Sequence, residues 1–233
     1  MTIAMRSDSS HQASHQAGFT LVEIAVVLVV IGVLLGGLLV PLTTQFETNQ
    51  RREADTRLDE IHNALLGFAA RNGRLPCPAT AASGGLALPN AATTACNVQH
   101  GFVPVRTLGL SMKVNGNGLA VDPWLNAYRY SVTGAAGGEF TNAISLGLVP
   151  DFQACEDSAC ASVLADNVVA VVFSTGEDGA AATSADQLEN LDGDTVFVSR
   201  DASEAAGSEF DDRVLWISPN VLAYQLVRAG RAN

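Results

Sequence analysis

A long apolar run with one carboxylate near its start constrains this chain more than any other feature. From Phe19 to Val40 the only ionisable side chain is Glu23. About 20 apolar residues are enough for a helix to cross a bilayer, because an α-helix rises about 1.5 Å per residue. We therefore expect one transmembrane helix over residues 19–40, with a single charged group inside it.

Glu23 needs a partner in that position. A charged side chain at membrane depth costs roughly 2.5–3.5 kcal/mol on insertion scales and normally persists only beside an opposite charge. No Lys, Arg or His lies within the run. A cut between Gly18 and Phe19 would supply a cation, because the new α-amine of Phe19, with an ordinary pKa near about 8, is protonated at neutral pH. That amine can pair with Glu23 of a neighbouring helix.

The stretch Gly18-Phe19-Thr20-Leu21-Val22-Glu23, with the apolar run behind it, resembles the class III leader and N-terminal helix of type IV pilins and type II secretion pseudopilins. The resemblance implies that a prepilin peptidase cuts after Gly18 and methylates Phe19, and that Glu23 assists subunit addition. It also implies assembly with other pilin-like subunits, in a homo- or hetero-oligomeric filament, on an inner-membrane platform. The expected location is the inner membrane, single-pass with the head in the periplasm, and then a periplasmic pseudopilus or cell-surface filament.

Four parts follow from this resemblance. They are a leader at 1–18, the transmembrane part of the helix at 19–40, its extracytoplasmic continuation at 41–75, and a pilin-like globular head at 76–233. The alternative is an ordinary signal anchor with an accidental Glu. A cleavable secretory signal fits less well, because the run exceeds the usual core of about 7–15 residues and no Ala-x-Ala-like site follows it.

Charge and cysteine content bound the possible partners and the compartment. The net charge is −11 and Lys113 is the single lysine, so we expect no nucleic-acid partner. An even number of cysteines in an exported domain suggests disulfides, and three pairings are possible. Proximity in the sequence favours Cys77–Cys96 and Cys155–Cys160. A zinc site using Cys77, Cys96 and His100 is the weaker alternative, because its spacing fits no standard Cys/His module.

Beyond the apolar run, the pattern predicts an α+β fold. Apolar residues recur at helical spacing at Leu58, Ile61, Leu65 and Phe68, so the helix continues with a stripe facing a sheet and ends near Gly73. Strands are expected at 128–132, 168–173, 195–199 and 213–217, in one small antiparallel sheet, and the apolar run at 168–173 suits a buried central strand. Ser218-Pro219 favours a short C-terminal helix to about Ala229. The predicted architecture is pilin-like: a long N-terminal transmembrane helix packed on a small antiparallel sheet.

Two segments of the head also resemble the major pseudopilins. The stretch 122–130 is similar to their Asp-Pro-Trp-Gly-Asn-x-Tyr-x-Tyr segment, with Leu125 in place of the usual Gly. Ser174-Thr-Gly-Glu-Asp-Gly179 resembles the opening of their calcium loop. The resemblance therefore implies Ca²⁺ as the one possible cofactor, with Asp178 as the best matched ligand and Asp192 and Asp194 as the next, in an acidic loop. A solvated acidic loop without a metal is the alternative.

No motif of an enzyme is present. The chain lacks a Gly-x-Ser-x-Gly elbow, a phosphate loop and a His-Glu-x-x-His pair, so we expect no catalytic residues. The interpretation is a structural subunit of a pseudopilus or type IV pilus-like filament that serves type II secretion. The alternatives are a minor type IV pilin, a signal-anchored binding or adhesion protein that uses the loop at 80–94, and, least favoured, an anchored hydrolase.

Overall fold

The structure, a computed structural model, contains one long helix at its N-terminal side, α1, which spans Leu21–Asn72. It describes residues 18–89, 95–134, 137, 139–145 and 147–231, without the side chains of 35–44. The predicted leader thus lies outside the described residues except for Gly18, as does the part of the 80–94 loop from 90 onward. The chain divides into two compact units, residues 1–47 and 48–233.

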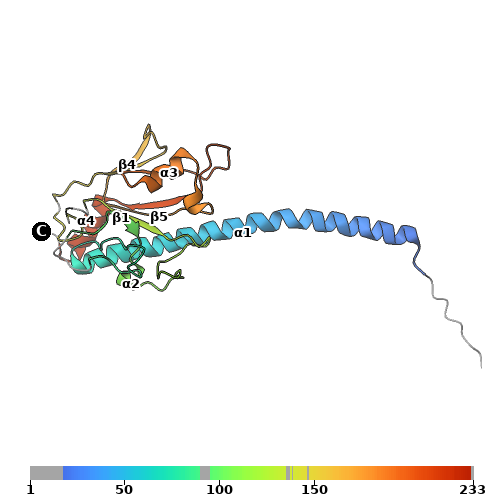
Figure 1. The fold of residues 1–233 in the computed structure, drawn as a ribbon, viewed down its shortest axis with the longest axis horizontal. Helices are drawn as coiled ribbons and strands as arrows, with labels where there is room; N and C mark the ends of the chain where they lie inside the picture. The colour runs from blue at the N-terminus through green and yellow to red at the C-terminus, as the bar shows by residue number, and fades with distance from the viewer. Residues whose placement is uncertain (1–17, 90–94, 135–136, 138, 146, 232–233) are drawn as a thin grey trace, which may run out of the picture. The chain divides into compact units, whose positions relative to one another are not determined.

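From here on, the head means the whole unit at 48–233, which adds residues 48–75 to the predicted 76–233. Among its described residues are the last part of α1, seven strands and three further α-helices. The strands are β1 (His100–Phe102), β2 (Arg129–Val132), β3 (Phe152–Cys155), β4 (Val163–Val168), β5 (Ala170–Ser174), β6 (Val196–Val198) and β7 (Arg213–Ile217). The helices are α2 (Val105–Leu108), α3 (Ala185–Asp192) and α4 (Pro219–Arg228), with a 3₁₀ turn, η1, at Gly179–Ala181. Figure 1 shows their arrangement along the head.

The strands form two sheets. One has four antiparallel strands in the order β1-β2-β5-β7, and the other has three in the order β4-β3-β6. In the second sheet β3 pairs with β4 antiparallel and with β6 parallel. The prediction of a single antiparallel sheet is therefore wrong in one respect, because the predicted strand at 195–199 belongs to the second sheet. The α+β class with an N-terminal helix and antiparallel sheet is confirmed.

The position of β5 explains why two sheets are needed. All five of its residues are buried, as expected for a central strand. Val172 contributes to the core that contains Ile61 and Leu65 of α1, whereas Val171 and Phe173 contribute to a second core with Phe152 and Phe197. Both faces of the strand are apolar and both require cover. The second sheet provides it on the face away from α1.

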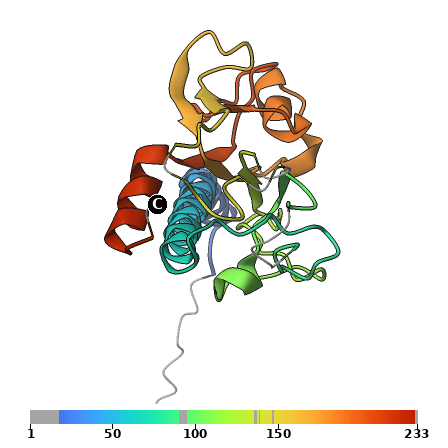
Figure 2. The ribbon, with the colours of Figure 1, turned by 90° about the vertical axis from the view of Figure 1, so that its left-hand side faces the viewer.

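The part of α1 in the head packs as its apolar spacing predicts. Leu58, Ile61, Leu65 and Phe68 are all buried. The helix ends at Asn72, where Gly73 adopts a positive φ of 69° and its amide donates to the Ala69 carbonyl (2.8 Å). Helix α4 lies beside α1 in the end-on view of Figure 2, and its Leu222 and Leu226 belong to the same core.

Two disulfides pair the cysteines as their proximity in the sequence favours. Cys77 bonds Cys96, with 5.4 Å between the Cα atoms, and Cys155 bonds Cys160, with 5.1 Å between them. The zinc alternative is wrong, because both of its cysteines are used in the first disulfide. The C-terminal helix also forms as predicted: the Ser218 hydroxyl accepts the Val221 amide and Pro219 occupies the first turn.

Candidate functional site

The start of α1 is organised by Thr20. Its hydroxyl accepts the backbone amide of Glu23 (3.2 Å), and its carbonyl accepts the amide of Ile24 (3.2 Å). Thr20 therefore caps the helix, and Glu23 lies in its first turn, where a negative charge is favourable near the positive end of the helix dipole. The carboxylate is exposed at the beginning of the apolar run.

The apolar side chains that follow have no cover within the described part of the chain. Every residue from Phe19 to Leu34 is exposed, and Phe19 retains 78% of its accessible surface. A contiguous apolar surface of this kind marks a protein or membrane contact. Among the described residues, no helix is sufficiently long and apolar to cross a membrane. The predicted span at 19–40 extends into residues 35–44, whose side chains lie outside that part.

In the head, the two segments singled out in the sequence are joined by Asp122. This buried carboxylate accepts the amides of Trp124 (3.0 Å) and Asn126 (2.8 Å) on one oxygen and the hydroxyl of Ser174 (2.6 Å) on the other. Asn126 in turn donates its side-chain amide to the Gly176 carbonyl (2.7 Å). Burial raises the pKa of Asp122, and these hydrogen bonds oppose that rise. The segments at 122–130 and 174–179 thus form one hydrogen-bonded unit.

The turn at Leu125 retains the conformation of a glycine. Its φ is +76°, a region that side chains with a Cβ adopt at a cost of about 1–2 kcal/mol. Gly179, with φ +58°, is required for another reason: a Cβ there would lie 2.5 Å from the side-chain oxygen of Asn126.

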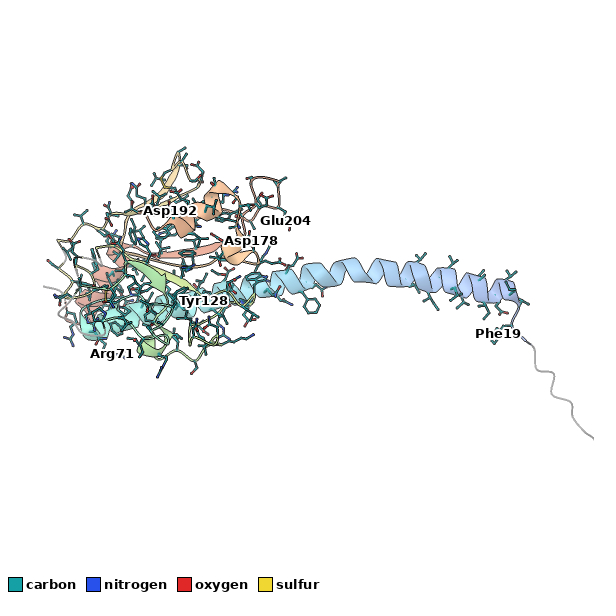
Figure 3. The ribbon with its side chains drawn as sticks, viewed as in Figure 1. Phe19, Arg71, Tyr128, Asp178, Asp192 and Glu204 are labelled. Atoms are coloured by element: carbon teal, nitrogen blue, oxygen red, sulfur yellow. A yellow bond between two sulfur atoms is a disulfide. The ribbon has the colours of Figure 1, made fainter. Side chains whose placement is uncertain are left out.

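Asp178, the best matched calcium ligand, lies in a second hydrogen-bond network, and Figure 3 labels its position in the head. Its carboxylate accepts the side-chain amide of Gln187 (3.1 Å), which also donates to Asp211 (2.8 Å). Burial and then the charge of Asp211 raise the pKa of Asp178. Asp178 is therefore held beside Asp211 by a shared donor.

Asp192 and Asp194 belong to a different group of carboxylates. With Glu189, they place one oxygen each within 4.8 Å of one another, which is the only such metal-compatible group in the described part. Asp194 donates its amide to Asp192 (3.0 Å) and accepts the amide of Val196 (2.7 Å). Burial, then the charges of Asp194 and Asp192, raise the pKa of Glu189. The structure does not bring Asp178 into this group.

Comparison with known proteins gives one match. Residues 13–39 match the family model described as the prokaryotic N-terminal methylation motif. The chain has a prepilin-type N-terminus. This match supports the prepilin-type family of pilins and pseudopilins, which the stretch from Gly18 to Glu23 resembles. Neither the curated proteins nor the solved structures yielded a match.

For a prepilin-type protein, the matched segment implies processing by a prepilin peptidase, a membrane-anchored precursor and assembly with pilin-like subunits. The match includes Gly18, Phe19 and Glu23. Their individual roles, as cleavage site, methylated residue and assembly residue, stay predictions.

Glu189 is the residue that the sequence analysis did not select. It lies in the acidic stretch, but that stretch is expected to be a loop, whereas the structure forms α3 from Ala185 to Asp192. The sequence holds the signal for this helix: Ser184 and Gln187 are spaced as a capping box, and Gly193 follows the last turn. On a helix, Glu189 and Asp192 are three residues apart and share one face.

Proposed function

We propose that this chain is a structural, non-enzymatic subunit of a pseudopilus that serves type II protein secretion. The single observation that carries the proposal is the match of residues 13–39 to the methylation motif, on a helix whose apolar side chains are exposed. The two pseudopilin-like segments joined through Asp122 favour the pseudopilus over the surface pilus.

The apolar surface of the helix has to stay covered throughout assembly. Exposing apolar surface to water costs roughly 25 cal/mol per Å², so the helix can leave the membrane only where other helices take the place of the lipid. Before assembly the membrane covers the helix at 19–40, and in the filament other helices of the same kind cover it. Because Glu23 is the only ionisable side chain in this run, pairing with the α-amine of a neighbour's Phe19 offsets the cost of taking its charge out of water. The head is periplasmic, on a single-pass inner-membrane anchor.

The mature N-terminus tests the processing step. Mass spectrometry of the protein purified from membranes should find N-methylated Phe19 as the first residue. A functional protein that keeps residues 1–18 would refute the filament proposal.

Glu23→Gln tests assembly. The variant should insert into the membrane and be processed as the parent is, but its incorporation into filaments should fall. Glu47→Gln is the matched control, because Glu47 is an exposed acid on the same helix outside the apolar run. Equal incorporation of the Glu23→Gln variant and the parent contradicts the pairing.

A deletion strain distinguishes the two filament systems. Loss of protein export with surface pili intact supports the pseudopilus. The opposite phenotype identifies a minor type IV pilin, and loss of neither, with processing absent, points to a signal-anchored binding protein.

We also propose that any bound calcium lies at Glu189, Asp192 and Asp194. Ca²⁺ takes six to eight oxygens, and three carboxylates within 4.8 Å can supply up to six of them. If so, millimolar Ca²⁺ should raise the melting temperature of the parent more than Mg²⁺ does, and Asp192→Asn should abolish the rise. Asp178→Asn is the comparison variant. If Asp178→Asn loses the Ca²⁺-dependent rise in melting temperature and Asp192→Asn keeps it, the ion is assigned to the loop at 174–179. No rise in the parent disproves the site.

A further inference from the structure

An acidic cleft opens on the side of the head where α1 enters it. The cleft has a volume of about 810 Å³ and lies between α1, the β3–β4 turn, the segment after β6, and β7. Its charged residues are the acids Asp55, Asp59, Glu156, Asp157, Asp201 and Asp212 and the arginines Arg200 and Arg213. Acids thus outnumber bases in the wall of the cleft.

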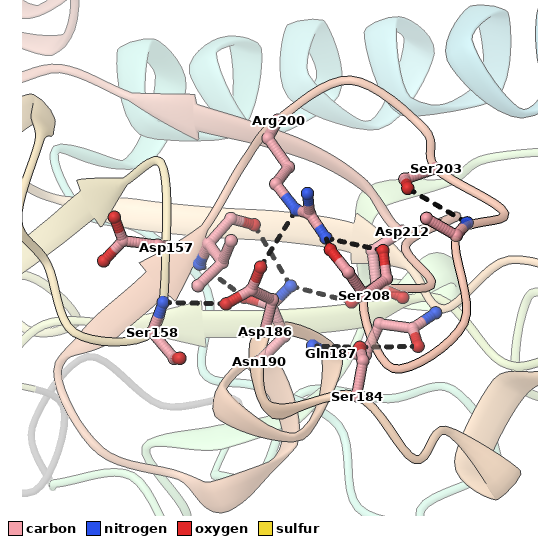
Figure 4. Close-up of polar contacts among 12 residues, drawn as sticks. Asp157, Ser158, Ser184, Asp186, Gln187, Asn190, Arg200, Ser203, Ser208 and Asp212 are labelled. Atoms are coloured by element: carbon pink, nitrogen blue, oxygen red, sulfur yellow. Dashed lines mark hydrogen bonds and ion pairs between the residues drawn. The ribbon is translucent and has the colours of Figure 1, made fainter.

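Both arginines are already paired. Arg213 binds Asp55 through two contacts, of 2.8 and 2.9 Å. Arg200 forms an ion pair with Asp186 (3.0 Å; Figure 4). Its guanidinium group also lies over the ring of Phe210. The other five acids of the cleft form no ion pair with any described residue. The cleft therefore carries an uncompensated negative charge.

Asp212 gives the cleft an available hydrogen-bond acceptor at its wall. The residue is only 4% exposed, and one of its oxygens accepts the side-chain amide of Asn190 (2.7 Å; Figure 4). Its other oxygen accepts no hydrogen bond within the described part of the chain. That oxygen is not one of the fully buried polar atoms without a partner, so it is accessible from the cleft and can accept a hydrogen bond from a ligand there.

A polypeptide with spaced basic side chains suits this cleft better than a metal ion. Among the described residues, only the carboxylates of Glu189, Asp192 and Asp194 lie close enough together to hold a metal ion. None of these three residues lines the cleft. Guanidinium groups on separate side chains can reach separate carboxylates, and each brings several donors.

The opposite end of the same head carries such side chains. Arg71, Arg228 and Arg231 are exposed and form no ion pair with a described residue. Arg228 lies over the ring of Tyr224, with 5.6 Å from the guanidinium carbon to the ring centroid. Tyr224 and Val227 on the same helix are exposed as well, at 60% and 58%. The C-terminal end of α4 therefore presents arginines beside apolar side chains.

The topology places this end and the cleft at opposite ends of the head. Strand β7 begins at Arg213, which binds Asp55 in the cleft, and runs to Ile217, from which the chain enters α4. The end of α1 and α4 both pack against the segment at 140–144. Figure 3 shows Arg71 at the far end of the head from Asp178 and Glu204. One copy therefore offers a basic surface at one end and an acidic cleft at the other.

We propose that the arginine end of α4 in one copy of this chain docks into the acidic cleft of the next copy. This contact rests on the proposed filament function and adds to it a head-to-tail interface that is independent of the N-terminal helix. Because the two surfaces differ and lie at opposite ends, the contact is heterologous and can repeat from copy to copy along a filament. The arginines bring donors to Asp212 and its neighbours, and Tyr224 and Val227 are covered at the rim.

Photocrosslinking in assembled filaments of the full chain tests the contact. A photoreactive amino acid is placed at Val227, and copies with two different tags are mixed so that bonds between copies are recognised. We expect crosslinks to peptides containing 156–157 or 199–201 of the other copy. The same amino acid at Val114, exposed elsewhere on the head, is the control and should not reach these peptides.

Charge reversal adds a quantitative arm. The double variant Arg228→Glu/Arg231→Glu should lower the crosslink yield by about tenfold, as expected for the loss of two charge pairs at an interface. Asp157→Arg/Asp201→Arg in the other copy should restore it. Arg106→Glu, an exposed arginine on α2, should change nothing.

The outcomes separate this contact from the filament itself. Filaments with processed Phe19 but without crosslinks into the cleft, or with yields insensitive to the reversals, overturn the contact alone. Crosslinks to a different protein overturn the assignment of a second copy. An unprocessed, monomeric chain overturns both proposals.

Discussion

Asp212→Asn should stabilise the head at neutral pH and leave its stability near pH 4 unchanged. Burial raises the pKa of Asp212 from the ordinary 3.8 to about 7 in the folded protein. Between these two pH values the folded state holds a proton that the unfolded state has released. Unfolding therefore releases a proton, and the free energy of unfolding falls as the pH rises through this window.

The magnitude follows from the same shift. A difference of about three pH units, at about 1.36 kcal/mol per unit, amounts to about 4 kcal/mol that the parent loses between pH 4 and pH 7. Asparagine has no charge to bury, and its carbonyl can still accept the Asn190 side-chain amide that now binds Asp212 at 2.7 Å. The variant should therefore exceed the parent by up to about 4 kcal/mol above pH 7, with no further change at higher pH.

The assay is denaturant unfolding of the full chain, dispersed in mild detergent and followed by tryptophan fluorescence, at intervals from pH 4 to pH 8. The difference between variant and parent is the quantity of interest, because the other titrating carboxylates contribute equally to both. Asp201→Asn, an exposed acid of the same cleft, should change stability by less than about 0.5 kcal/mol. A difference for Asp212→Asn that is constant with pH, or that favours the parent at pH 8, refutes the reasoning.

Two further predictions concern the turn and the disulfides of the head. Leu125→Gly should raise the free energy of unfolding by about 0.5–1 kcal/mol, because glycine adopts a positive φ without strain and the lost side chain is 59% exposed. Leu125→Ala keeps the Cβ and should give no gain. Denaturant titration of the two variants and the parent measures the difference. Removing the Cys77–Cys96 disulfide, with a sequence separation of 19, should cost about 3 kcal/mol, and removing Cys155–Cys160, with a separation of 5, about 2 kcal/mol. Both pairs are replaced by serine and compared by thermal denaturation, and an equal or larger cost for the shorter loop would contradict the loop-entropy argument.

Local patterns in the sequence predict the elements whose signals are local. The stripe at Leu58, Ile61 and Leu65 predicts the buried face of α1, and the apolar run at 168–173 predicts the central strand. Ser218-Pro219 predicts the start of α4, because a hydroxyl cap and a proline in the first turn act within four residues. These elements can be predicted because the residues that specify each one lie within it or directly beside it in the sequence.

The second sheet could not be predicted in this way. Strands β3 and β6 have four and three residues and pair in parallel, so their partners lie far apart in the sequence. What decides their pairing is the need to cover Val171 and Phe173 on the outer face of β5. That need becomes visible only when the first sheet is in place. Helix α3 is a different case, because its capping residues Ser184 and Gln187 are local and could have been recognised.

The hydrogen bonds of Asp122 bear on how far the head's resemblance to the major pseudopilins extends. Asp122 and Asn126 hold the backbone and Ser174 side chain of the 174–179 segment, so both resembling segments are accounted for by one structural unit. Asp178, the predicted metal ligand in that segment, is bonded through Gln187 to Asp211 instead. In this chain the two segments form one hydrogen-bonded turn structure, and this arrangement gives no separate support for calcium. A metal site in this head must be judged on Glu189, Asp192 and Asp194, which neither segment includes.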